Sequence, residues 1–571
     1  MIARRMTTTT RFAGLVAGLL LVLGATALWL GGASTAGGAD GNINTVVGTV
    51  GGFAGDGGQA DQALIRNPKD IAPTPGGGLL IADSANDRIR RVGADGIIST
   101  VAGDGGGDPA AGTCPNGVDA TLVSLTAPAG ITPLAGGAFL IADSGDSCIR
   151  RVNADGSIQN VAGGAGAGLA GDGGAAVGAK LNGPRDIIAM PDGAFLIADT
   201  GNHRIRRLSA GGTITTIAGT TQGLSGDGGP AGAAQLDSPR KLTLMPDGAV
   251  LVADTGNDRI RRIAPDGIIT TVAGGSAGFS GDGARALDAK LDVPSDVVPL
   301  TNGGFVVADT GNNRVRRVTP LGTIFTIAGS APGLSGDGGP ATQARLDAPE
   351  GLAISASGGV LIADTANQRV RGTTDTGALP APVVTRSIGF SPGAGAVLVR
   401  PPGSFTFIPL REQDIAANGS VVQAAAGSVD ISVQKTNDGP VTAMRFAQGD
   451  FSLRQGGGPN PITDVRLTEP LDGCPATSTR ARRGRSAHAS LLARSSARKK
   501  RSRYILARGK GRFRTRGRYA SALVRGTSWT TLDRCDSTLV RVTTGLVEVR
   551  DQVKRKTVFV SAGRSYVARR R

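Results

Sequence analysis

Short apolar runs alternate with clusters of glycine, aspartate and asparagine from about residue 42 to residue 377. Runs of this length, bounded by turn-forming residues, are typical of β-strands rather than of helices. No long helical heptad occurs in the chain. The pattern of apolar and polar positions therefore predicts an all-β protein.

Three phrases recur at a regular interval, which indicates a repeat architecture. The first begins as Ile81-Ala-Asp-Ser-Ala-Asn, and its last four aspartates are spaced by 55 residues. A second phrase, close to I-x-T-V-A-G, and a third, G-x-x-G-D-G, recur beside it. The aspartates of the first phrase are Asp83, Asp143, Asp199, Asp254, Asp309 and Asp364.

Each unit contains four predicted strands. In the third unit these are 186–188 after Pro184, 194–198, 204–208 and 213–218, with turns between them. Four short antiparallel strands, repeated six times, predict a six-bladed β-propeller over residues 42–377.

The ends of the repeat region complement each other. The sixth unit ends near Arg371 without its I-x-T-V-A-G strand, whereas one such strand stands alone at Ile43 to Gly48. Pairing of the two would remove an exposed sheet edge. We therefore expect residues 43–48 to close the ring as the fourth strand of the last blade.

The recurring D-x-x-N-x-R-I core resembles the NHL family. This resemblance implies a six-bladed propeller that acts as a binding platform, often for other proteins, although a few related propellers are lyases or hydrolases. The second unit departs from the family pattern. There Asp146 replaces asparagine, Cys148 replaces arginine, and residues 105–118 form a longer loop.

The turn after the second strand and the loop after the fourth strand are expected at one face of each blade, which places carboxylates beside arginines. In a structural interpretation, Asp199 accepts backbone N–H groups in its turn, and Arg204 pairs with a nearby carboxylate. In a functional interpretation, this rim binds a ligand. Its candidate residues are Asp83, Asp143, Asp199, Asp254, Asp309, Asp364, Arg88, Arg204, Arg259, Arg314 and Arg369.

Catalytic and metal motifs are scarce. The only histidines, His203 and His488, fall in different predicted domains, which excludes a histidine metal cage. His203 is expected to be a solvated turn residue. G-x-S-x-G, Walker and H-E-x-x-H motifs are absent. We predict no metal site and no cofactor; Ca²⁺ bound by carboxylates is the alternative, although no D-x-D-x-D-G loop occurs.

The C-terminal region also has β periodicity. Residues 378–387 are expected to be a linker, and 388–571 a second, smaller β-rich domain. Its last part, with Val524-Arg-Gly-Thr527, Gly545-Leu-Val-Glu-Val549 and Val560-Ser-Ala-Gly563, resembles the FecR-like periplasmic sensor domain. This resemblance implies a β fold that makes protein contacts. Transmembrane signalling does not follow, because only about eleven residues precede the apolar N-terminal stretch, too few for a cytoplasmic domain.

The positive charge of the chain is concentrated in one segment. The net charge is +17 (62 − 45), and residues 480–518 hold 16 Lys or Arg and no Asp or Glu. This basic insertion is either a solvated loop or a surface for anionic cell-surface polymers and lipid head groups. Nucleic acid is not expected as a partner, because the chain is exported and only Tyr504 and Phe513 within the segment offer stacking rings.

The N-terminus and the cysteines indicate export. Arg4, Arg5 and Arg11 precede the uncharged stretch 12–30, so residues 1–36 form a signal peptide or an N-terminal membrane anchor. Four cysteines suit an oxidising compartment, and we expect the pairs Cys114–Cys148 and Cys474–Cys535; four free buried thiols are the alternative.

These observations predict an extracellular or cell-surface, non-enzymatic binding or scaffold protein. Its expected partners are envelope proteins or anionic polymers, with the membrane reached through residues 12–30. The alternative is an extracellular propeller hydrolase or lyase that uses carboxylates, with or without Ca²⁺. A sensor that regulates transcription is a third interpretation, which requires an uncleaved anchor and a membrane partner.

Overall fold

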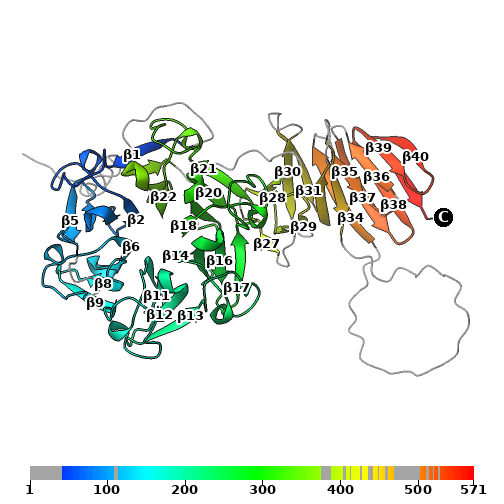
Figure 1. The fold of residues 1–571 in the computed structure, drawn as a ribbon. Helices are drawn as coiled ribbons and strands as arrows, with labels where there is room; N and C mark the ends of the chain where they lie inside the picture. The colour runs from blue at the N-terminus through cyan, green and yellow to red at the C-terminus, as the bar shows by residue number, and fades with distance from the viewer. Residues whose placement is uncertain are drawn as a thin grey trace, which may run out of the picture. The chain divides into compact units, whose positions relative to one another are not determined.

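The computed structural model describes residues 41–107, 113–374 and, with short internal gaps, 387–468 and 502–570. Strands and short 3-10 helices make up all regular structure in these ranges. Six four-stranded sheets are arranged in a ring (Figure 1). The all-β fold class and the six-bladed propeller are therefore confirmed.

Each blade is an antiparallel sheet, and in five of the six the strands follow chain order from the inside outwards; in the sixth, β1 is the outermost strand. The innermost strands are β2 (Pro68–Pro73), β6 (Pro128–Pro133), β10 (Asp186–Ala189), β14 (Pro239–Leu244), β18 (Pro294–Pro299) and β22 (Pro349–Ile354). The second strands are β3 (Leu79–Asp83), β7 (Phe139–Asp143), β11 (Phe195–Asp199), β15 (Val250–Asp254), β19 (Phe305–Asp309) and β23 (Val360–Asp364).

The outer half of each blade follows the same scheme. The third strands are β4 (Arg88–Val92), β8 (Cys148–Val152), β12 (Arg204–Leu208), β16 (Arg259–Ile263), β20 (Arg314–Val318) and β24 (Arg369–Thr373). The outermost strands are β5 (Ile98–Ala102), β9 (Ile158–Gly163), β13 (Ile214–Ala218), β17 (Ile269–Ala273), β21 (Ile324–Ala328) and β1 (Ile43–Val47). Aliphatic clusters fill the spaces between neighbouring blades, as the shortage of aromatic residues requires.

Twelve short 3-10 helices connect the described strands. Five follow second strands: η2 (Ser84–Asn86), η6 (Thr200–Asn202), η8 (Thr255–Asn257), η10 (Thr310–Asn312) and η12 (Thr365–Asn367). Six lie in the connections between blades: η1 (Ala60–Gln62), η3 (Ala120–Leu122), η5 (Ala176–Gly178), η7 (Ala231–Ala233), η9 (Ala286–Asp288) and η11 (Ala341–Gln343). The remaining one, η4 (Ala135–Gly137), lies in the second blade.

The ring closes as the sequence predicts. Strand β1 pairs antiparallel with β24, and Ile43 lies opposite Thr373. The connection that precedes β22 adds two further contacts: Gly338 N donates to Ile43 O at 2.9 Å, and Thr45 Oγ1 donates to Asp337 Oδ2 at 2.7 Å. The outermost strand of the last blade is therefore supplied by the start of the propeller, and no bare edge remains there.

The variable residue of the turn motif binds the next blade. It adopts the left-handed region, with φ between 53° and 58°, and its side chain accepts the N–H of the residue before the next inner strand. His203 does this with Nδ1, which lies 3.0 Å from Ser238 N, so the expectation of a solvated histidine is wrong. The equivalent pairs are Asp87–Ala127, Ser147–Gly183, Asp258–Val293, Asn313–Ala348 and Gln368–Asn67.

The threonine or serine that directly follows the aspartate of each second strand makes a second contact between blades through its hydroxyl group. Thr200 Oγ1 donates to Pro239 O at 2.7 Å, and Thr365 Oγ1 donates to Pro68 O at 2.7 Å across the closure. Because Pro carries no N–H, its carbonyl is the backbone group left for this contact. The hydroxyl and the variable residue together join each blade to its neighbour.

The second blade is held by a disulfide. Cys114 and Cys148 are bonded, with their Cα atoms 6.5 Å apart, so this predicted pair is confirmed. Cys148 occupies the position at which the other blades carry arginine. The second predicted pair involves Cys474, which lies outside the described residues.

The C-terminal region consists of two sheets. One contains β28 (Asp414–Ala417), β25 (Ser387–Pro392), β30 (Ser428–Gln434), β31 (Val441–Ala447), β34 (Ser502–Gly509), β37 (Thr527–Arg534), β38 (Ser537–Thr544) and β41 (Ser565–Arg569). The other contains β27 (Ile408–Pro409), β26 (Leu398–Arg400), β29 (Val421–Gln423), β32 (Asp450–Gln455), β33 (Thr463–Leu467), β35 (Phe513–Arg516), β36 (Ala520–Val524), β39 (Leu546–Asp551) and β40 (Lys556–Ser561).

These two sheets pack face to face. Phe446 of the first sheet contacts Phe451 and Phe513 of the second, with ring centroids 5.6 and 5.7 Å apart. The indole N–H of Trp529 donates to Thr515 Oγ1 at 3.0 Å, also from one sheet to the other. The smaller β-rich region predicted after the propeller is therefore present as a two-layer structure with its own core.

Several predicted segments fall wholly or partly outside the description. The N-terminal segment 1–36, nearly all of the linker 378–387 and the first part of the basic insertion, up to residue 501, are not described. The rest of that insertion contains β34 and β35, so its described part belongs to the sheets. Within the described ranges, no helix has the length and apolar character needed to span a membrane.

Removal of β1 tests the closure. A chain that starts at residue 49 leaves β24 with an unpaired edge, and we expect a lower Tm and aggregation. A chain that starts at residue 41 keeps β1 and is the matched control. Light scattering after size exclusion and calorimetry measure both effects; a monodisperse monomer with unchanged Tm would contradict the role of β1.

The disulfide of the second blade is expected to stabilise the propeller. The half-cystines are separated by 34 residues, for which loop entropy gives about 4 kcal/mol. We therefore expect Cys114→Ala/Cys148→Ala to unfold at a lower urea concentration than the oxidised wild type. The reduced wild type should behave like the double variant, and identical midpoints for all three would refute this contribution.

Candidate functional site

One face of the propeller carries the predicted rim. Pro239, where an inner strand begins, lies opposite Asp254, where the second strand of the same blade ends. The turns that follow the second strands and the starts of the inner strands are therefore at the same end of the blades. We call this end the turn face.

The six predicted aspartates of the turn face are fully buried. Asp199 illustrates their environment: Oδ1 accepts the N–H of Asn182 at 2.8 Å, and Oδ2 accepts from Asn202 Nδ2 at 2.8 Å and from Arg206 Nη1 at 3.1 Å. Burial raises the pKa of each carboxyl, to about 8 for Asp143 and about 6 for Asp364. These carboxylates are structural acceptors, as the structural interpretation of Asp199 expected.

A different arginine from the expected one pairs with these aspartates. Arg206, rather than Arg204, is fully buried, and its second amino nitrogen lies 2.8 Å from Asp172 Oδ1. Arg204 and Arg206 lie two residues apart and so share one side of β12. Arg206 is the one that contacts the connection before the blade, at Ala170 O, Lys180 O and Asp172 Oδ1. The equivalent Asp–Arg–Asp groups are Asp83–Arg90–Asp56, Asp254–Arg261–Asp227, Asp309–Arg316–Asp282 and Asp364–Arg371–Asp337.

We expected the Gly-Asp-Gly segments, which follow the fourth strands, on the same face as the turns. They do not lie on the turn face. Each belongs to a connection that runs along the outermost strand towards the opposite end of the blade and returns. Gly173 N donates to Ile214 O, and Ala176 N donates to Gly212 O, each at 2.8 Å. Gly212 lies in the turn between the third and fourth strands, at the end opposite the turn face.

The predicted rim arginines are half-buried on the turn face, and they lie beside apolar side chains. The guanidinium of Arg88 lies 3.9 Å from the ring centroid of Phe53, and that of Arg314 lies 4.1 Å from Phe279. Arg204 Nη1 donates to Asn202 O, in the turn directly before it, at 3.2 Å. Arg259 and Arg369 donate to carbonyls of the neighbouring connections.

Five blades present one exposed apolar side chain each, at the first variable position of the G-x-x-G-D-G phrase. These residues, which we call the apolar ring, are 43–46% exposed: Phe53, Leu169, Leu224, Phe279 and Leu334. The preceding glycine is held by the turn, since Asn202 Nδ2 donates to Gly168 O at 2.7 Å. Gly168 has φ 144°, a conformation that favours glycine.

Sequence reasoning missed the apolar ring, although a signal was present. Leucine or phenylalanine recurs after the first glycine of the phrase in every unit except the second. In the second unit Asp146 replaces the asparagine that binds this glycine elsewhere, and Cys114 and Cys148 join the connection to the blade instead. That blade contributes no member to the ring.

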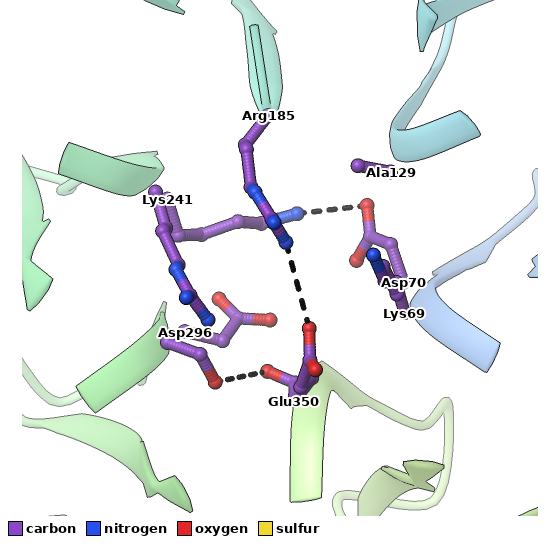
Figure 2. A pocket seen from close by; sticks show the side chains of 9 residues that line it. Lys69, Asp70, Ala129, Arg185, Lys241, Asp296 and Glu350 are labelled. Carbon is purple, nitrogen blue, oxygen red and sulfur yellow. Dashed lines mark hydrogen bonds and ion pairs between the residues drawn. The ribbon is translucent and has the colours of Figure 1, made fainter. Parts of the chain in front are cut away.

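A small recess lies where the six inner strands begin (Figure 2). Its volume is about 30 Å³, enough for one or two water molecules. The residues directly after the inner-strand prolines form its mouth: Lys69, Ala129, Arg185, Arg240, Ser295 and Glu350. Arg185 Nη1 lies 3.8 Å from Glu350 Oε2, as the dashed line in Figure 2 marks. We call this site the axial recess.

The next position of each inner strand forms a layer beneath the mouth. Around the ring it is occupied by Asp70, Gly130, Asp186, Lys241, Asp296 and Gly351. Lys241 Nζ lies 2.9 Å from Asp70 Oδ2 and 3.2 Å from Asp186 Oδ1. The aspartates also accept N–H groups of the following blade, at Ile131, Leu242 and Leu352.

Burial controls the charge of this layer. It raises the pKa of Asp186 to about 6 and that of Asp296 to about 7, although Lys241 opposes both shifts. Burial also opposes the charge on Lys241, but Asp186, Asp70 and Asp296 outweigh it and hold the pKa of Lys241 well above its usual value. Within the described residues, no three His, Cys, Asp or Glu side chains gather as a metal-binding group.

Comparison with known proteins supports the repeat identity. The NHL-repeat family model matches residues 181–208, which include the second strand, turn and third strand of the third blade. The third blade therefore contains an NHL repeat, and the ring of six similar blades is consistent with a propeller built from repeats of this type.

Two curated relatives are similar to part of this chain. Teneurin-1 of Homo sapiens is 30% identical over 229 residues, which cover 35% of this chain and 8% of teneurin-1. Protein SUPPRESSOR OF QUENCHING 1, chloroplastic, of Arabidopsis thaliana is 28% identical over 204 residues, 34% of this chain and 19% of that protein. The chain therefore spans less than a fifth of the length of either relative.

Solved structures show more distant similarity. An auxiliary nutrient binding protein from Bacteroides ovatus ATCC 8483 is 15% identical with a TM-score of 0.43, covering 58% of this chain and 76% of that one. Catalytically inactive virginiamycin B lyase from Staphylococcus aureus is 17% identical with a TM-score of 0.35, covering 54% and 80%. At these values neither structure bears on the chemistry of the axial recess.

The pH dependence of stability tests the buried layer. Because the pKa of Asp296 is raised by folding, its contribution is present near pH 4 and is lost as the pH rises through about 7. Asp296→Asn removes this titration but keeps an oxygen for Leu352 N–H. Between about pH 5 and pH 8 we expect the wild type to lose about 2 kcal/mol more stability than the variant.

Urea unfolding at several pH values measures this difference. Asp192→Asn is the control, because Asp192 is exposed and Ala194 N–H and Arg207 lower its pKa. That control should retain the wild-type slope across this range. Parallel stability curves for the wild type and D296N would contradict a raised pKa at Asp296.

Proposed function

We propose that this chain is a non-enzymatic, exported binding protein whose turn face recognises a protein partner. The apolar ring is the observation that carries this proposal. Partly exposed leucine or phenylalanine recurs at one equivalent position of five blades. A single exposed apolar side chain needs no explanation, but the same exposed position repeated around a ring offers recurring apolar contacts on one face, as interaction surfaces do.

The neighbouring arginines support the same function. Arg88 and Arg314 lie over Phe53 and Phe279, so cation and ring are held together before a partner arrives. Aromatic residues and arginine are enriched at interface positions that contribute most to affinity. Because the turns fix both groups, little conformational entropy is lost on binding.

The carboxylate-based hydrolase or lyase is less well supported. The turn aspartates are fully buried and occupied by backbone, asparagine and arginine donors. The aspartates of the axial layer bind Lys241 or backbone N–H groups. A recess of about 30 Å³ admits only a small group, so a substrate of ordinary size has no room there.

The C-terminal region extends the proposal. Its resemblance to the FecR-like domain supports a second protein-binding surface, and the basic insertion 480–518 supports contact with anionic cell-surface polymers. Export through residues 1–36, with or without retention of 12–30 as an anchor, places these surfaces outside the cytoplasm.

Substitutions in the apolar ring test the proposed function. Leu224→Ser and Phe279→Ser remove exposed apolar groups, so the fold should be unaffected while each change weakens partner binding roughly 5- to 30-fold. Val177→Ser and Leu287→Ser are matched controls. Both side chains are also exposed, at 54% and 42%, but they lie in η5 and η9, whose first residues bind turns at the end opposite the turn face.

The measurement is crosslinking of the full chain to proteins of the envelope, followed by affinity determination for each captured protein. A partner kept by the control variants and lost by the ring variants supports the proposal. Equal capture by all four variants would contradict a role for the turn face.

A further inference from the structure

The mouth of the axial recess has an excess of positive charge. Lys69, Arg185 and Arg240 line this mouth at the starts of three blades, and Glu350 is the acid at the same level. Figure 2 labels Lys69, Arg185 and Glu350. Glu350 pairs with Arg185. Among the residues that the structure describes, the side chains of Lys69 and Arg240 have no hydrogen-bond or ion-pair partner.

The two unpaired cations lie in an unfavourable setting. Burial and the neighbouring Arg185 lower the pKa of Lys69 and of Arg240, and the attraction of Glu350 offsets only part of this effect. The acids beneath do not relieve this, because Asp70 and Asp186 bind Lys241 while Asp296 accepts the N–H groups of Val297 and Leu352. Half-buried cations without partners are stabilised by an added anion.

We propose that the axial recess binds a single oxyanion group, a carboxylate or a phosphate, through Lys69, Arg185 and Arg240. The ligand class follows from the donors, since a guanidinium matches the two oxygens of a carboxylate or phosphate and an ammonium adds a point charge. The volume of about 30 Å³ admits no more than oxygen atoms of such a group, so the rest of the ligand stays outside the mouth. This site is distinct from the apolar ring, which lies on the connections between blades rather than on the inner strands.

Thermal denaturation of the full chain in increasing phosphate or acetate, at ionic strength held constant with chloride, tests the site. Tenfold excess over Kd should raise the wild-type Tm by about 2–4 °C, and the Tm should continue to rise with the logarithm of the anion concentration. Arg240→Gln and Lys69→Gln should lose most of this response. Arg262→Gln should retain it, because Arg262 pairs with Asp247 at 2.6 Å and is not part of the recess.

A variant that is expected to strengthen anion binding keeps the test decisive if Arg240→Gln folds poorly. Glu350→Gln removes the competing acid, so it should lower the Kd for the anion several-fold while leaving the cations in place. Response to acetate alone assigns the site to carboxylates, and response to phosphate alone assigns it to phosphate groups. Shifts that match those of chloride, or that are equal in wild type, R240Q, K69Q and E350Q, would overturn the proposal.

Discussion

The buried carboxylate at the end of each second strand is the interaction on which the propeller depends. It accepts a backbone N–H from the incoming connection, an amide N–H from the turn asparagine and a guanidinium N–H from the third strand. A charge placed in the interior without these donors would cost several kcal/mol. The connection, the turn and the third strand are therefore held in one geometry in each blade that retains the motif.

Contacts between blades use the residues next to this carboxylate. The threonine or serine after it binds a proline carbonyl of the next blade, and the left-handed residue three positions further binds an N–H. Aspartate, asparagine, glutamine, serine and histidine all serve at the latter position, because each offers an acceptor within reach. The same contacts cross the junction between the last and first blades, where β1 completes the sheet.

The candidate surface is a consequence of this framework. The turn asparagine that binds the aspartate also binds the glycine before each member of the apolar ring, so a structural motif determines which side chain faces solvent. The second blade lacks both the asparagine and the ring residue, and a disulfide joins its connection to the third strand. The centre of the same face is not repeated in this way, because the residues after the six prolines differ from blade to blade.

The strands, the six repeats, the closing strand and the Cys114–Cys148 pair could all be predicted from the sequence. These features depend on local periodicity, on turn residues and on recurrence, which are present in the chain itself. The sequence could also show that Asp199 was suited to accept backbone N–H groups. It could not show that Arg206 rather than Arg204 is its partner, because both lie on the same side of the third strand and the choice depends on how the connection with Asp172 packs against that strand.

The axial recess was decided by the tertiary structure alone. Lys69, Arg185 and Arg240 are far apart in the chain, and each is unremarkable in its own repeat. They meet because the ring places the start of every inner strand around one axis, so single substitutions in separate blades become neighbours. The sequence by itself determined the repeated unit and its number; only closure of the ring determined which non-repeated side chains face each other, since that depends on distances between blades.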